Sequence, residues 1–136
     1  MSTTNDESTT NSMGSDSISV EVSCTKDGTV VVRIVGDIDM ATQRHLRTRF
    51  DETFAEFPSP KAVLVDLAEI TFFGSAGIEL LVALAERSST RGHPFRIVTG
   101  NNRAVIRPLE VTGLDRSLDL VPTFDAAYAL PPPGRD

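Results

Sequence analysis

The sequence predicts an α/β fold, in which a single domain has a mixed central β-sheet flanked by about four helices. Short runs of β-branched or apolar residues alternate with segments of helical periodicity along the chain. Residues 62–65 form a continuous apolar run, which is typical of a central strand covered on both faces. The 136 residues are enough for one domain to bury a core without disulfides or metal.

A β-hairpin is predicted at the start of this domain. Residues 18–24 alternate apolar and polar side chains, as a half-buried strand does, and residues 29–35 are a β-branched run. Asp27 and Gly28 between them are a turn signal. Cys24 shares the parity of the apolar positions, so we expect it on the inner face of the first strand.

The first helix is predicted directly after Gly-Asp-Ile-Asp at residues 36–39, which ends the second strand. Its apolar side chains fall on one stripe at helical spacing, namely Leu46, Phe50, Phe54 and Phe57. Pro58 and Pro60 then stop the helix.

The remaining elements continue the alternation. Residues 66–73 lead from the central strand to a turn at Gly74, and a second helix is predicted from about Ser75 to Ser89. Residues 95–98 form another short buried strand.

Asn101 or Asn102 can cap a third helix, and Gly113 is suited to end it. A short strand near residues 117–120 and a last helix over residues 123–130 complete the domain.

Both ends of the chain differ from this pattern. Residues 1–17 are almost entirely small and polar, so burial cannot offset their ordering entropy, and we expect them to be disordered. Residues 131–136 form a proline-rich C-terminal tail. The folded domain is therefore predicted over residues 18–130.

The composition excludes several classes of function. A net charge of −6 argues against nucleic acid or an anionic membrane as a partner. No signal peptide and no apolar run of membrane-spanning length is visible, so we expect a cytoplasmic protein. Two histidines and one cysteine make a poor metal set, and no catalytic triad, carboxylate pair or phosphate-binding loop is seen. We therefore expect no catalytic residue, cofactor or metal.

The segment at residues 72–78 carries the strongest functional signal. It places the Ser75 hydroxyl between small neighbours where a strand gives way to a helix. The unpaired N–H groups and positive partial charge of a helix N-terminus favour a phosphate there. The small neighbours let another protein approach closely. Ser75 is thus predicted to be a switch residue rather than a catalytic one.

The second helix is apolar on two sides. Its sheet-facing stripe is predicted to be Ile78, Leu81, Val82 and Ala85. Leu80 and Leu84 point about half a turn away. Either a neighbouring element covers these two leucines, or they form an apolar docking patch beside Ser75.

Residues 30–130, about three quarters of the chain, resemble the STAS domain of bacterial anti-sigma factor antagonists. The resemblance lies in Gly-Asp-Ile-Asp at residues 36–39, Gly-Ser-Ala-Gly at residues 74–77 and Glu-Val-Thr-Gly-Leu at residues 110–114. The order of the elements matches as well.

That resemblance implies a function. The usual family motif is Asp-Ser-(Ser or Thr)-Gly, whose first serine is phosphorylated by the partner anti-sigma factor, a Ser/Thr kinase of the histidine-kinase ATPase fold. By position the phosphoacceptor is Ser75, while Gly74 replaces the aspartate and Ala76 the second hydroxyl residue. A PP2C-type phosphatase would restore the active form. The expected function is to sequester the anti-sigma factor and so release a sigma factor for transcription.

The expected partner-binding surface is Asp37, Ile38, Asp39, Gly74, Ser75, Ala76, Gly77, Leu80 and Leu84. For Asp37 and Asp39 the alternative is turn and N-cap chemistry. Two alternative functions remain. One is a STAS scaffold module in a signalling or lipid-transport complex, and the other is a small enzyme or nucleotide binder on a flavodoxin-like fold. Whether the chain forms a homodimer stays open.

Overall fold

The computed structural model describes residues 18–129, so the expectations for residues 1–17 and 130–136, including the end of the predicted last helix, lie outside the described residues. The elements follow in the order β1 (Ile18–Cys24), β2 (Thr29–Ile38), α2 (Met40–Glu56), β3 (Ala62–Phe73), α3 (Ser75–Arg91), β4 (Phe95–Val98), α4 (Arg103–Val111), the 3₁₀-helix η2 (Leu114–Arg116), β5 (Leu120–Val121) and α5 (Phe124–Ala129). The predicted α/β alternation is confirmed.

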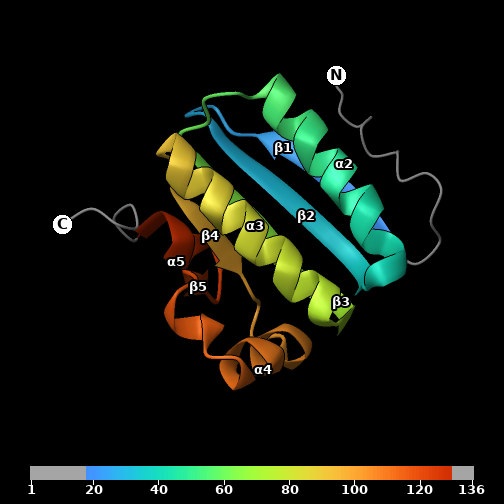
Figure 1. Cartoon of the computed structure of the whole chain (residues 1–136). Coiled ribbons are helices and arrows are strands. Elements are labelled where there is room, and N and C mark those ends of the chain that lie inside the picture. The colour runs from blue at the N-terminus through green and yellow to red at the C-terminus, as the bar shows by residue number, and fades with distance from the viewer. Residues whose placement is uncertain (1–17, 130–136) are drawn as a thin grey trace.

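The strands form one mixed sheet in the order β1-β2-β3-β4-β5. β1 is antiparallel to β2, as the hairpin prediction requires, and the other neighbours are parallel. The carboxyl ends of β2 and β3 therefore lie at the same edge of the sheet. The helices α2 and α3 begin at this edge, toward the lower right of Figure 1.

The helices α2 and α3 lie side by side over one face of the sheet (Figure 1). The main core lies between them and the strands, and the predicted stripe of α2 is buried there at Leu46, Phe50 and Phe54. A smaller cluster forms where α5 packs, and its buried members are Leu64, Val98, Val121 and Ala127. The central position of residues 62–65 is thus confirmed, since Val63 and Leu64 are buried on opposite faces.

Three details differ from the expectations. Burial along β1 fades from Ile18 to Cys24, and Cys24 on this edge strand is exposed although its partner Val30 on β2 is buried. The last strand is only Leu120–Val121, and a 3₁₀-helix occupies part of the segment before it. The third difference is the length of β3, which continues as a strand to Phe73.

The extra length of β3 is irregular. Relative to β2, it holds one additional residue between Asp66 and Glu69 and a second between Ile70 and Phe72. Each is a β-bulge, which bends a strand and changes where its side chains point.

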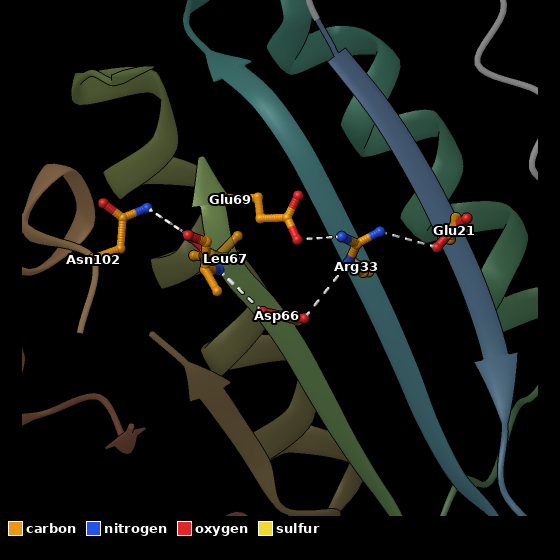
Figure 2. Close-up of polar contacts among 7 residues, drawn as sticks. Glu21, Arg33, Asp66, Leu67, Glu69 and Asn102 are labelled. Carbon is orange, nitrogen blue, oxygen red and sulfur yellow. Dashed lines mark hydrogen bonds and ion pairs between the residues drawn. The ribbon is translucent and has the colours of Figure 1, made fainter. Parts of the chain in front are cut away.

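Polar side chains hold the first bulge from two sides (Figure 2). The Asn102 amide donates to the carbonyl oxygens of Leu67 at 3.1 Å and Ile70 at 2.8 Å. On the other side, the Asp66 carboxylate accepts from the Ala68 N–H at 3.0 Å. The backbone groups that the bulge removes from the ladder therefore still have partners.

Arg33 of β2 extends this network across the sheet (Figure 2). Its guanidinium lies 3.4 Å from Glu21 of β1 and 3.9 Å from Asp66, and it also pairs with Glu69. Hydrogen bonding to Glu69 raises the pKa of the already basic Arg33. Three adjacent strands are thereby linked through one side chain.

Candidate functional site

The candidate site is the junction between β3 and α3. Ser75 is the first residue of α3 and its side chain is exposed, as the switch prediction requires. The N–H of Gly74 donates to the carbonyl oxygen of Ile38 at 3.0 Å, which ties the junction to the end of β2. The Ser75 hydroxyl therefore faces solvent, while the backbone of the preceding residue, Gly74, is fixed to the end of β2.

The N-terminus of α3 has no side-chain cap. Its N-cap residue is Gly74, which offers no acceptor beyond its own carbonyl. That carbonyl accepts from the N–H groups of Gly77 at 2.9 Å and Ile78 at 3.3 Å. The N–H groups of Ser75 and Ala76 precede the first intrahelical bond, so the positive end of the helix dipole is open beside the hydroxyl.

Gln43 of α2 also fixes the first turn of α3. Its amide nitrogen donates to the carbonyl oxygen of Ala76 at 3.0 Å and to the Glu79 carboxylate at 3.2 Å. Gly77 serves packing, because a Cβ there would lie 2.5 Å from the Phe73 ring. The position of Ser75 is therefore set by both α2 and the core.

The two aspartates of β2 and α2 have different roles. Asp39 caps α2, and its carboxylate accepts from the N–H groups of Ala41 at 2.9 Å and Thr42 at 3.0 Å. The Thr42 hydroxyl accepts in turn from the Asp39 N–H, which completes a capping box and confirms the N-cap alternative. Asp37 instead accepts a 2.6 Å hydrogen bond from the exposed Thr71 hydroxyl.

The predicted docking patch is wrong. Leu80 and Leu84 are only 1% and 4% exposed, and Ile38 is fully buried. The reason is that α3 packs against both the sheet and α2, so that a wide arc of the helix is covered. Of the predicted sheet-facing stripe, Leu81 is buried, whereas Ile78, Val82 and Ala85 are only half-buried. The most buried face of α3 is therefore displaced from the predicted stripe toward Leu80 and Leu84.

Burial also removes Ala76 and Gly77 from the accessible surface. Of the nine residues expected to contact a partner, the ones that remain exposed or half-buried are Asp37, Asp39, Gly74 and Ser75.

Two apolar side chains that the sequence reasoning missed are exposed beside this junction. Met40, the first residue of α2, is 86% exposed, and Phe72 near the end of β3 is 51% exposed. The Phe72 ring lies against Gly74. The sequence indicated these two side chains only by their positions next to the motifs at residues 36–39 and 74–77.

The sequence also matches a known protein family. The family model described as the STAS domain matches residues 22–127. The chain belongs to the STAS domain family.

Several relatives of this STAS domain come from mycobacteria. The anti-sigma-F factor antagonist RsfB of Mycobacterium tuberculosis is 32% identical over 112 residues, which cover 82% of this chain and 88% of that protein. A crystal structure of an anti-sigma factor antagonist from Mycobacterium paratuberculosis has a TM-score of 0.73 at 36% identity, covering 85% of this chain and 94% of that one. SpoIIAA of Bacillus in its unphosphorylated form has the same fold, with a TM-score of 0.65 at 14% identity over 79% of this chain and 92% of that one.

Other places in this STAS domain carry less chemistry. Among the described residues, no group of three or more His, Cys, Asp or Glu side chains could hold a metal ion. Within residues 18–129 no helix is long and apolar enough to cross a membrane. A hollow of about 400 Å³ lies at the opposite edge of the sheet, lined in part by Lys61, Arg96 and Tyr128. Burial and the nearby Asp27 raise the pKa of the Tyr128 hydroxyl.

Proposed function

We propose that this STAS domain is an anti-sigma factor antagonist that binds an anti-sigma factor while Ser75 is unmodified, and so releases a sigma factor for transcription. Phosphorylation of Ser75 ends the binding. The observation that carries the proposal is the exposed hydroxyl at the uncapped N-terminus of α3. The names of the mycobacterial relatives support it, since the similarity spans most of both chains.

The switch acts through charge. A phosphate adds about −1.5 to −2 charge to Ser75. In the free protein the open N–H groups of α3 stabilise that charge. In a complex the partner must close over the same point and strip water from the phosphate. A penalty of about 3 kcal/mol lowers the affinity about 100-fold, because each 1.4 kcal/mol is a factor of ten.

The junction is too well held for the phosphate to act by refolding it. The Gly74 N–H is bonded to Ile38, and the Gln43 amide is bonded to Ala76. The first turn of α3 therefore keeps its place while the charge of its first side chain changes. A local electrostatic effect is sufficient for release.

The finer parts of the proposal concern the partners. The anti-sigma factor is the kinase that modifies Ser75, a PP2C-type phosphatase reverses the modification, and the chain itself is not an enzyme. Support comes from the chemistry of the junction, which offers an exposed acceptor hydroxyl at the first residue of α3. A scaffold role without phosphorylation is the alternative.

The test uses the full chain and each anti-sigma factor encoded in the genome of its source, measured by calorimetric titration. The unmodified chain and Ser75→Ala should bind the same factor equally tightly, and Ser75→Asp at least about tenfold more weakly. After incubation with ATP and Mg²⁺, mass spectrometry should locate the phosphate on Ser75.

Ser89 supplies the matched control. It is also an exposed serine of α3, but it lies near the other end of the helix. Ser89→Asp should bind as the unmodified chain does. Phosphate transfer to the Ser75→Ala variant followed by release would show that Ser75 is the wrong residue. A chain that binds no anti-sigma factor but co-purifies with transporter subunits would favour the scaffold.

A further inference from the structure

Exposed apolar side chains gather at the Ser75 junction. In the described part of the chain four large apolar side chains are strongly exposed, namely Met40, Phe72, Val111 and Tyr128. Phe72 precedes Ser75 by three residues, and Met40 follows Ile38, whose carbonyl holds Gly74, by two. A single exposed apolar side chain is ordinary, so it is the position of these two beside Ser75, and not their exposure alone, that indicates a partner surface.

The second bulge of β3 explains why Phe72 is exposed. Because of the extra residue there, Asp37 lies opposite Phe72 and Ile38 opposite Phe73. Phe73 is then 5% exposed and packs on Gly77 of α3, while Phe72 is left outside the core. The Thr71 hydroxyl, bonded to Asp37, occupies the bulge itself. The outward aromatic side chain is thus built into the strand and is not a frayed end.

The Phe72 ring occupies the space that a side chain at position 74 would need. A Cβ at Gly74 would lie 3.0 Å from Cε2 and 3.3 Å from Cζ of Phe72. The backbone does not require glycine, since its φ is −94° and ψ is −168°. Glycine at this position therefore lets the ring rest beside Ser75, where the related motif has an aspartate.

We propose that Phe72, assisted by Met40, is the apolar anchor on which the anti-sigma factor docks over Ser75, and that the missing side chain of Gly74 leaves room for the ring in the docking position. The inference rests on the proposed function and adds the residue that selects the partner. The fitting partner surface has an apolar recess for the ring next to the segment that covers Ser75. A central aromatic anchor of this kind dominates the affinity of many interfaces.

Charge favours a different protein over a second copy of this chain. The carboxylates of Asp37, Asp39 and Glu79 lie around the junction, and each is exposed or half-buried. Two copies meeting through this face would place these carboxylates against one another, and the net charge of each chain is −6. A partner that offers hydrogen-bond donors or cations around its recess meets no such repulsion.

The experiment measures the affinity of variants of the full chain for the anti-sigma factor that the unmodified chain binds. Phe72→Ala should weaken binding about 30-fold or more, and Met40→Ala several-fold. Gly74→Ala should weaken it less than Phe72→Ala does, because the new Cβ moves the ring by only a few tenths of an ångström while the backbone accepts alanine. Phosphate transfer to Ser75 should slow with Phe72→Ala at low substrate concentration and recover at saturation.

Tyr128 provides the matched control. It is an aromatic side chain with the same 51% exposure as Phe72, but it lines the hollow at the opposite edge of the sheet. Tyr128→Ala should bind within about twofold of the unmodified chain. Circular dichroism and the thermal midpoint of each variant show whether the fold is retained, and Phe72→Leu keeps an apolar side chain should Phe72→Ala fail to fold.

Each outcome decides between the two proposals. Binding of folded Phe72→Ala within twofold of the unmodified chain would overturn this inference and leave the proposed function intact. A wild-type chain that binds no anti-sigma factor would overturn both. Sedimentation that shows a dimer lost in Phe72→Ala would assign the anchor to a second copy and also overturn the inference.

Discussion

The helices α2 and α3 begin at the same edge of the sheet, after neighbouring strands, yet their first turns differ. The α2 helix is closed by Asp39 and Thr42 in a capping box. The α3 helix starts from Gly74 with no side-chain cap and has Ser75 as its first residue. The helix that carries the hydroxyl is therefore the one whose N–H groups are left for a ligand.

A third helix that begins at this edge, α4, is also closed by a side-chain cap. The α4 helix is capped by Asn102, whose side chain accepts from the Ala104 N–H at 3.0 Å. Capping side chains compete with any incoming anion for the same donors. Among α2, α3 and α4, the one with a phosphorylatable first residue is the one without such competition.

The comparison of the two N-termini assumes that α3 is packed as firmly as α2. Leu80→Ala tests this assumption and should have the largest effect on stability. Leu80 is 1% exposed, so the substitution should lower the free energy of unfolding by about 2–5 kcal/mol. Urea denaturation measures the loss, and the half-buried Val82→Ala should lose clearly less. A loss of partner binding with unchanged stability would instead restore Leu80 to the docking surface.

Removing the cap of α2 should make its N-terminus resemble that of α3. Asp39→Ala leaves the N–H groups of Ala41 and Thr42 without their acceptor and should lower the free energy of unfolding by about 1 kcal/mol. Chemical denaturation again provides the measurement. Asp37→Asn, which leaves this cap intact, is the control, and equal losses in the two variants would contradict the distinct roles of the two aspartates.

A charge on Ser75 should strengthen the fold of the free protein while weakening its complex. Phosphorylated Ser75 meets the open end of α3 and should raise the free energy of unfolding by about 0.3–1 kcal/mol at low salt. Thermal denaturation of the modified and unmodified chains measures the difference. In Gly74→Asp the gain should shrink, because the new carboxylate occupies the same N–H groups. A phosphate that destabilises the free protein would mean that the junction does not accept the charge.

A smaller effect is expected at the C-terminal end of α3, where His93 can be changed without affecting the N-termini of α2 and α3. Burial lowers the pKa of His93 from 6.5, with Arg91 and Arg87 acting in the same direction. Below pH 6.5 the unfolded chain therefore binds a proton that the folded chain resists, and stability falls as the pH falls. His93→Gln should flatten the dependence of the unfolding midpoint between pH 7 and 5. Partner affinity at pH 7 should not change, and a steeper dependence in the variant would contradict the assignment.

Much of the fold was accessible from the sequence because its signals are local. The hairpin turn, the α2 stripe and the Asn102 cap each depend on residues close together in the chain, and all three are confirmed. The full length of β3 was not accessible. Asp66, Glu69 and Thr71 interrupt its apolar pattern, and their partners, such as Arg33, come from other strands.

The position and exposure of Ser75 could be predicted from the sequence, whereas the extent of the exposed surface around it could not. Ser75 follows from its own neighbours, and the structure places it exposed at the helix start. Whether Leu80 and Leu84 face solvent depends on how α2 lies against α3, and the periodicity of one helix contains no information about its neighbour. The exposure of Phe72 depends on a bulge, which is a property of two paired strands.

The sheet order has a consequence for how the protein is made. Every strand pairs with the strand synthesised immediately before it, so no pair skips a strand in chain order. The parallel pairs of β3 join residues more than 30 positions apart, so they close later than the hairpin, but their order suits a chain that leaves the ribosome from its N-terminus. The hairpin, α2, β3 and α3 precede β4 in the chain. The strands and helices that display the hydroxyl are therefore synthesised before β4, whose Phe95 and Ile97 complete the core beneath α3.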